Sequence, residues 1–176
     1  MIEYKELFEG EICRELFDSF IRRQEVGNCW RRENGVWVIK SDPFIDDWSE
    51  SDYQNLVNEL KSTLSSGGFA AGAFLDGRLK GFVSVSAALL GSQGQYLDLT
   101  NIYVSSEMRR MGIGRELFNL ARSWASCKKA EKLYISAHSA VESQAFYKSL
   151  GCVEASEYSL YHVSREPFDC QLELIL

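Results

Sequence analysis

The stretch "YLDLTNIYVSSEMRRMGIGRELFNLARSWA", Tyr96 to Ala125, predicts a strand, a loop and a helix in direct succession. Its opening "YLDLTNIYV" is rich in β-branched and aromatic side chains, as strands are. The helix runs from about Gly112 to Ser126, and its inward-facing residues are Leu117, Leu120, Ala121 and Trp124. Clustered arginines and glycines replace the usual Ser or Asp cap, so something other than the helix sets the composition of the loop.

This loop has the composition of an anion site. A helix N-terminus leaves its first N–H groups unpaired and carries about half a positive charge, and glycines let a ligand approach the backbone. No P-loop string, G-x-x-x-x-G-K-[ST], is present. The dinucleotide fingerprint G-x-G-x-x-G fails at its third glycine, because Leu117 stands there. A third pattern, [RQ]-x-x-G-x-[GA], matches Arg109 to Gly114 directly after the strand.

The flanking segments extend the strand and helix pattern on both sides. "FAAGAFL" and "LKGFVSVSA" surround Asp76-Gly77, which predicts a hairpin. "KLYIS" predicts a buried strand, "VESQAFYKSLG" a short helix, and both "CVEASEYSLYHV" and "CQLELIL" closing strands. Upstream, Ser49 or Ser51 caps an expected helix through Leu64. The chain therefore belongs to the α/β class.

The N-terminal third carries weaker patterns. A short strand in "EYKELF" precedes apolar residues at helical spacing, which predict an amphipathic helix from Glu11 to Gln24. The following segment has no sustained period, and we expect an ordered loop with a short hairpin around Asn34-Gly35. We divide the single domain 1–176 into a helical acceptor-side region (1–66), a cofactor-binding core (68–151) and C-terminal strands (152–176).

Composition excludes several classes of protein. With 176 residues, 45% of them hydrophobic, the chain suits one domain, and its net charge of −6 argues against a nucleic-acid binder. No apolar run approaches the roughly 20 residues of a membrane span, and we expect no secretory signal. Five cysteines without a C-x-x-C pair, and two histidines, predict neither a disulfide scaffold nor a metal site. A reducing cytoplasm is the expected location.

Together, "YLDLTNIYVSSEMRRMGIGRELFNLARSWA", "KLYISAH" and "ESQAFYKSLGC" resemble the GNAT superfamily of acetyl-CoA-dependent N-acyltransferases. The order and spacing of the motifs match from about Gly68 to Gly151. The resemblance implies a single α/β domain with a mixed, mostly antiparallel sheet of about 6–7 strands. These strands would splay between the fourth and fifth, with about four flanking helices. It also implies acetyl-CoA as co-substrate, and it allows a homodimer, since many relatives form one.

The resemblance also assigns the cofactor contacts. Backbone N–H groups of the loop would bind the pyrophosphate of coenzyme A, and Arg109 would hold the loop or touch the pyrophosphate. Ile102, Tyr103 and Val104 match the strand whose backbone pairs with pantetheine and the acetyl carbonyl. The amides of the loop belong to Arg110, Met111, Gly112, Ile113, Gly114 and Arg115.

Two catalytic roles follow from the same resemblance. Tyr147 matches the acid that protonates the departing thiolate, although a tyrosine in "AFYKSLG" also suits the edge of a core. Asp98 corresponds to the base of the histone-acetylating branch, although it also suits the solvent-facing start of a strand. Strand alternation, a bulge aside, puts Asp98, Thr100, Ile102 and Val104 on one face. Glu142 and His138 are weaker candidates for the base.

One position departs from the family pattern. Many members carry an asparagine that contacts the cofactor where this chain has Ala140. Ser139 and Ser143 are the candidates to replace it.

The acceptor pocket is expected in the N-terminal third, where Trp30, Trp37 and Trp48 lie among carboxylates. Aromatic rings and acids suit a cationic amine, although the tryptophans also suit a long loop pinned to the core. Cys170 has no histidine partner by spacing and is expected to be structural, which favours direct attack in a ternary complex.

The predicted function is transfer of the acetyl group of acetyl-CoA to a small-molecule amine. The alternatives are acetylation of a protein lysine or N-terminus, and non-catalytic acyl-CoA sensing.

Overall fold

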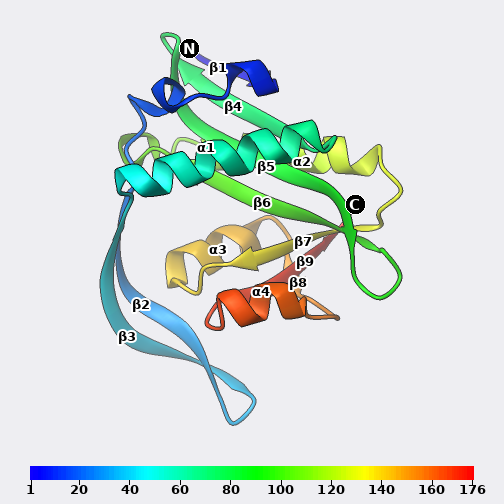
Figure 1. Ribbon diagram of the computed structural model, residues 1–176. Coiled ribbons are helices and arrows are strands. Elements are labelled where there is room, and N and C mark those ends of the chain that lie inside the picture. Colours follow the sequence, from blue (N-terminus) through cyan, green and yellow to red (C-terminus); the bar gives the residue numbers. More distant parts are fainter.

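A seven-stranded sheet in the order β1-β4-β5-β6-β7-β9-β8 organises the chain, and β2 and β3 form a separate two-stranded hairpin (Figure 1). The computed structural model describes all residues 1–176. Within the large sheet only β6 and β7 pair in parallel. The strands are β1 (Ile2–Glu6), β2 (Arg23–Glu33), β3 (Val36–Asp47), β4 (Phe69–Leu75), β5 (Arg78–Leu90), β6 (Tyr96–Val104), β7 (Lys132–Ala137), β8 (Val153–Glu154) and β9 (Cys170–Ile175).

Helices cover both faces of the sheet. On one face, α2 (Ile113–Ser126) and α3 (Val141–Ser149) pack into the larger apolar core with the inner residues of β4 to β7. On the other face, α1 (Glu50–Ser65) covers β4 and β5, and α4 (Leu160–Arg165) lies over β6 and β7 (Figure 1). No helix in the fold combines the length and the apolar character that crossing a membrane requires.

The central strands part where the resemblance implied. β6 and β7 pair only over Tyr96–Asp98 and Lys132–Tyr134, whereas β6 continues to Val104. The remainder of β7 pairs with β9 alone. These are the fourth and fifth strands of the sheet, so the expected mostly antiparallel sheet with its splay is confirmed.

A bulge at Thr100 changes the faces of β6. Ser84 pairs with Asn101 and Val85 with Leu99, which leaves Thr100 as an extra residue. Ile102 and Val104 consequently pack against the core of α2, whereas Asp98 faces α4. The expectation that these residues share one face with Asp98 is wrong, because the extra residue reverses the alternation.

Most elements of the core appear as predicted. Ser49 caps α1 in a reciprocal capping box with Asp52, and α1 buries Tyr53, Leu56, Val57 and Leu60. Asp76 and Gly77 turn the chain between β4 and β5, both with positive φ.

The expected helix from Glu11 to Gln24 is wrong. Two short 3₁₀ turns, Glu9–Glu11 and Arg14–Phe17, occupy part of this segment, and β2 begins at Arg23. The apolar residues that suggested the helix are buried beneath α1 instead, where Phe17 and Phe20 meet the ring of Phe82. Aromatic packing therefore satisfies the pattern without a continuous helix.

The expected loop is a long hairpin. β2 and β3 pair from Arg23–Asp47 to Glu33–Val36 around Asn34-Gly35, whose φ angles are 50° and 81°. The turn was predicted, but its strands are far longer than expected, and the hairpin extends away from the sheet (Figure 1). Region 1–66 therefore contains more strand than helix, with α1 as its one α-helix.

The segment "CVEASEYSLYHV" was expected to be a strand. Only Val153–Glu154 pairs with β9, and the chain then turns into α4. The side chain of Ser159 accepts the backbone N–H of His162, and this cap starts the helix.

Candidate active site

The loop before α2 forms a cradle of unpaired backbone amides. Arg110 has a φ of 63° and Gly112 a φ of 82°, so two left-handed residues bend the chain immediately before Ile113. No side chain caps the helix at Gly112. The N–H groups of its first turn are consequently free to bind an anion.

Gly114 lies at a closely packed position. A Cβ at this position would lie 3.2 Å from the ring of Phe146 and 3.7 Å from Val104. Its hydrogen therefore lets the start of α2 approach α3 and β6 closely. Arg115 extends the contact, because its Nη2 lies 3.4 Å from the hydroxyl of Ser149.

Arg109 holds the loop in place. Its Nη2 donates to the carbonyl of Arg23 at 2.9 Å, and its Nε donates to the carbonyl of Val104 at 3.4 Å. Partial burial lowers the pKa of this guanidinium, and the charge of Arg22 lowers it further. These contacts join the loop to β6 and to the start of β2. Met111 beside it is exposed.

A cavity of about 540 Å³ joins this cradle to the splayed strand and to α3. Ser143 lines this cavity, whereas the hydroxyl of Ser139 accepts from Nη1 of Arg31 at 2.5 Å. Of the two candidate serines, only Ser143 lines the cavity. Apart from Met111, the lining includes every residue that the sequence assigned to the cofactor, together with Tyr147: Ile102, Tyr103, Val104, Arg109, Arg110, Gly112, Ile113, Gly114 and Arg115.

Tyr147 closes the inner end of the site. It is 8% exposed, and it lies in the core cluster as well as in the lining of the cavity. Burial raises the pKa of its phenol strongly, and the charges of Tyr103, Cys152 and Asp169 add to this effect. The phenol is therefore protonated at any working pH and is a hydrogen-bond donor.

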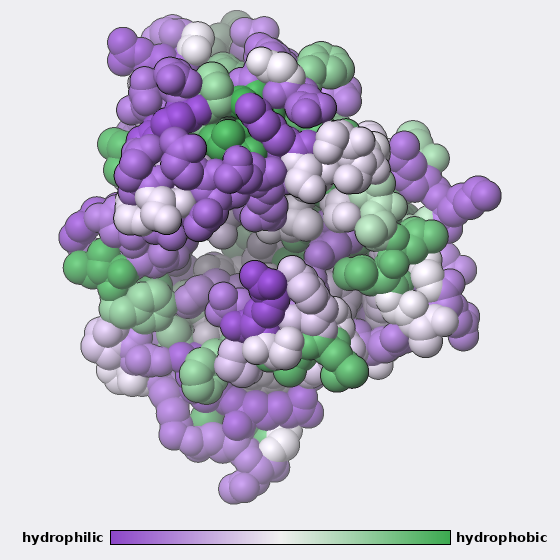
Figure 2. Space-filling model, viewed as in Figure 1, coloured by the Kyte–Doolittle hydropathy of each residue, from purple (hydrophilic) through white to green (hydrophobic).

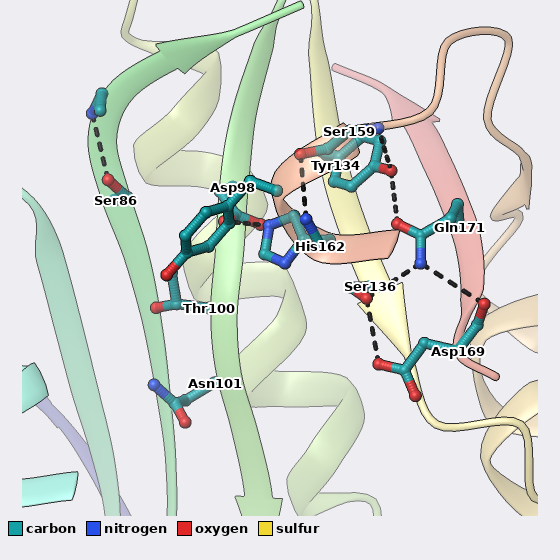
Figure 3. Close-up of polar contacts among 12 residues, drawn as sticks. Ser86, Asp98, Thr100, Asn101, Tyr134, Ser136, Ser159, His162, Asp169 and Gln171 are labelled. Carbon is teal, nitrogen blue, oxygen red and sulfur yellow. Dashed lines mark hydrogen bonds and ion pairs between the residues drawn. The ribbon is translucent and has the colours of Figure 1, made fainter. Parts of the chain in front are cut away.

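On the opposite face, Asp98 is paired with a residue that the sequence did not single out. Its Oδ2 lies 2.7 Å from Nε2 of His162 on α4, and the imidazole stacks on the ring of Tyr134 at 5.6 Å and 18° (Figure 3). The hydrogen bond to Asp98 raises the pKa of His162. No sequence motif could have found this pair, since α4 was expected to be a strand.

A network of hydrogen bonds lies next to this pair and holds Tyr134, on which the imidazole stacks. The phenol of Tyr134 donates to Gln171 at 2.5 Å and accepts the backbone N–H of Ser159 at 2.9 Å. Gln171 in turn donates to Ser136, whose hydroxyl donates to Asp169 at 3.0 Å (Figure 3). Burial raises the pKa of Asp169.

Helix α1 also contributes a carboxylate to the face of the sheet that carries Asp98 and His162. Glu59 accepts from the amide of Asn101 at 2.9 Å, and the same amide donates to Ser84. Figure 2 shows the surface hollowed between the part formed by α1 and the part formed by α4. Asp98, His162 and Glu59 therefore belong to the face opposite the amide cradle.

The three tryptophans predicted for the acceptor pocket lie in two places. Trp30 and Trp37 line a second cavity of about 590 Å³, which we call the cavity behind α3. Residues of α3, β8 and β9, including Lys148 and Cys170, complete its lining. Trp48 instead stacks on Phe20 and packs edge-on against Tyr103 at 4.9 Å. Of the three, only Trp48 contacts a residue of the splayed strand.

The two weaker candidates for the base, His138 and Glu142, lie in different surroundings. His138 accepts the backbone N–H of Ala140 through Nδ1 at 3.0 Å and packs on Phe44, whereas Glu142 lines the cavity of the cradle. Burial raises the pKa values of Cys152 and Cys170 to about 12. The structure contains no group of three or more His, Cys, Asp or Glu side chains that could hold a metal ion.

The sequence model of the acetyltransferase (GNAT) family matches residues 33–152. The chain belongs to this family. No curated protein matches it in sequence.

Solved structures share the fold over nearly the whole chain. Nourseothricin acetyltransferase is 19% identical with a TM-score of 0.69, and the match covers 98% of this chain and 95% of that one. A Bacillus anthracis protein whose suggested activity is streptothricin acetylation, in complex with acetyl coenzyme A, is 16% identical with a TM-score of 0.71 (100% and 99% covered). The ribosomal-protein-S18-alanine N-acetyltransferase from Escherichia coli is 15% identical with a TM-score of 0.60 (99% and 94% covered).

Proposed function

We propose that the protein transfers the acetyl group of acetyl-CoA to an amine of a small molecule by direct attack in a ternary complex. One observation carries the proposal: the uncapped amides before α2 open into the same cavity as Tyr147 and the unpaired part of β6. The site thus offers an anion cradle, an extended backbone edge and a proton donor in one continuous space.

In this proposal the pyrophosphate of acetyl-CoA binds the amides between Arg110 and Arg115. The helix dipole and the neighbouring arginines favour its negative charge. The pantetheine arm then extends along Ile102 to Val104, where β6 has lost β7 as a partner. A free N–H of this edge donates to the acetyl carbonyl and stabilises the oxyanion as the amine attacks.

Tyr147 serves the leaving group. When the C–S bond breaks, the thiolate accepts a hydrogen bond from the phenol and takes up a proton through it. The raised pKa of the phenol makes a free phenolate costly. The proton must therefore be replaced as it leaves, and the active site has to stay connected to solvent at this point.

Two observations support direct attack rather than an acyl-cysteine intermediate. Cys152 and Cys170 have pKa values raised to about 12, so neither thiol forms much thiolate at neutral pH. Both also line the cavity behind α3 rather than the cavity of the cradle. An amine that attacks the thioester directly needs no such nucleophile.

A small-molecule acceptor has precedents among the structures that share the fold. Two of them are named for the acetylation of nourseothricin and streptothricin, with TM-scores of 0.69 and 0.71. Carboxylates of Asp98, Asp169 and Glu59 around the opposite face suit an acceptor that carries positive charge.

Thiol release from acetyl-CoA, measured with a panel of mono- and polyamines and with basic peptides, tests this function. We expect release that depends on a small amine and yields its N-acetyl product. Acetyl-CoA binding without transfer to any member of the panel would favour a sensor instead. Tyr147→Phe should lower kcat about 10-fold to 100-fold, whereas Tyr4→Phe, at the far edge of the sheet, should not.

A further inference from the structure

The Asp98–His162 pair has a geometry that the fold alone does not require. Asp98 is the last residue of β6 that pairs with β7, where it lies opposite Tyr134. The two strands separate directly beyond it. Its side chain is 10% exposed, and its Oδ1 is buried with no hydrogen-bond partner. An unpaired carboxylate oxygen costs stability. A purely structural position would be filled better by an apolar residue.

The pair also fixes the tautomer of the imidazole. A carboxylate accepts but cannot donate, so the neutral ring carries its proton on Nε2 and presents a lone pair on Nδ1. No hydrogen bond within the chain occupies Nδ1 of His162. Figure 3 shows this nitrogen turned away from Asp98, on the side where the strands carry Asn101 and Ser136.

The charge of Asp169 acts on His162 and also on Tyr147, which lines the cavity of the cradle. This charge adds to the effect of Asp98 in raising the pKa of His162. It also adds to the effect of burial in raising the pKa of Tyr147. His162 and Tyr147 are therefore within electrostatic range of the same carboxylate, although they belong to opposite faces of the splayed strands.

We propose that Nδ1 of His162 accepts the proton that the acceptor amine loses, and that Asp98 positions the ring. The inference rests on the proposed acetyl transfer. The acceptor ammonium passes one proton to Nδ1, and the neutral nitrogen then attacks, so that an N–C bond forms and the C–S bond breaks. The second N–H proton is lost to solvent while the thiolate gains a proton through Tyr147. His162 returns its proton to solvent, so one proton is released overall.

The proposal assigns a sign to the pH dependence. Asp98 and Asp169 favour the protonated ring, Arg165 opposes them, and Tyr134 stacks on the imidazole. Glu59 faces the pair from α1, and its own pKa is raised mainly by burial and also by the charge of Asp98, while the charge of Arg165 lowers it. Since only the neutral ring accepts a proton, turnover rises with pH through a pKa above 6.5. A base with a raised pKa is also better matched to an alkyl ammonium, whose pKa is roughly 10.

His162→Gln tests the assignment, because a glutamine amide can keep the hydrogen bond to Asp98 but cannot accept a proton at neutral pH. The variant and the native chain are compared on acceptors of graded pKa. We expect kcat to fall about 100-fold for a primary alkylamine. For an acceptor whose pKa lies below the assay pH, such as hydroxylamine, the loss should shrink to within about threefold. His138→Gln, which removes the other imidazole, should leave the dependence on acceptor pKa unchanged.

Affinity for coenzyme A separates this test from a general loss of structure, and it should be unaltered in His162→Gln. His162→Asn offers the same comparison if the first variant does not fold. An equal loss for every acceptor would mean that His162 is structural, and no loss at all would also overturn the assignment. If the native chain transferred acetyl to no acceptor, the proposed function itself would fall, and this inference with it.

Discussion

The two faces of the splayed strands are built by different means. On the α2 face, backbone amides, a left-handed glycine and the edge of β6 form the site, and the residues that provide them lie within Ile102 to Arg115. On the α4 face, side chains from α1, β6, β7, α4 and the start of β9 converge, and Asp98 and His162 are 64 residues apart. A backbone site suits a constant ligand such as the proposed coenzyme A, whereas a side-chain site can change with the acceptor.

Asp98→Asn should produce the largest effect and should act on one face only. The imidazole loses its carboxylate partner, so kcat for alkylamines should fall about 100-fold while affinity for acetyl-CoA stays within about twofold. NMR titration should show the pKa of His162 returning towards 6.5. An equal loss of cofactor affinity would remove the distinction between the two faces.

The same pair should give stability an unusual dependence on pH. A histidine whose folded pKa is raised stabilises the fold below its unfolded pKa of about 6.5 and loses this contribution as pH rises through the folded value. Asp98→Asn should therefore destabilise the protein more at pH 6 than at pH 9. Urea unfolding at the two pH values measures the difference, and an opposite order would contradict the ion pair.

Glu173→Gln should be the next largest change, and it concerns how the α4 face is held together. Glu173 is buried, yet its hydrogen bonds to Lys132, Tyr96 and Ser156 outweigh this burial and lower its pKa to about 2. Its contribution is present above the unfolded pKa of about 4.5 and disappears as pH falls towards 2.

Removing this charge should therefore cost about 2 kcal/mol at pH 7 and much less at pH 3. Urea midpoints at the two pH values provide the measurement. Glu3→Gln on β1 carries no such partners and serves as the control. A loss that is the same at both pH values would mean that the charge of Glu173 is not involved.

Gly112→Val should raise KM for acetyl-CoA about 10-fold and leave the ranking of acceptors unchanged. A side chain at φ 82° costs about 1–2 kcal/mol, so the loop would move away from its cradle geometry. Gly77→Val is a matched control, because Gly77 has a φ of 74° in the turn between β4 and β5. It should lower stability without changing KM. An unchanged KM in Gly112→Val would contradict the role of the loop.

Trp37→Phe should have the smallest effect. Trp37 lies in the cavity behind α3, away from both faces of the splay, so KM for the acceptor should change by less than about twofold. Trp48→Phe, beside Tyr103, is the informative partner in this comparison. If Trp37→Phe altered acceptor choice more than Trp48→Phe, the acceptor would lie behind α3 instead.

The contrast between the two faces also explains what sequence could predict. The cradle is encoded by consecutive residues and Tyr147 by a second short motif, so a sequence pattern could predict both. The Asp98–His162 pair depends on the bulge at Thr100 and on α4, and both arise from tertiary packing that no local pattern records. For the same reason, aromatic packing beneath α1 replaced the helix expected from Glu11 to Gln24.

The most direct measurement is a crystal structure with coenzyme A bound. The account predicts pyrophosphate oxygens within hydrogen-bonding distance of the amides between Arg110 and Arg115, and the thiol between β6 and β7 with access to His162. Coenzyme A bound in the cavity lined by Trp30 and Trp37, or with its pyrophosphate away from the start of α2, would contradict it.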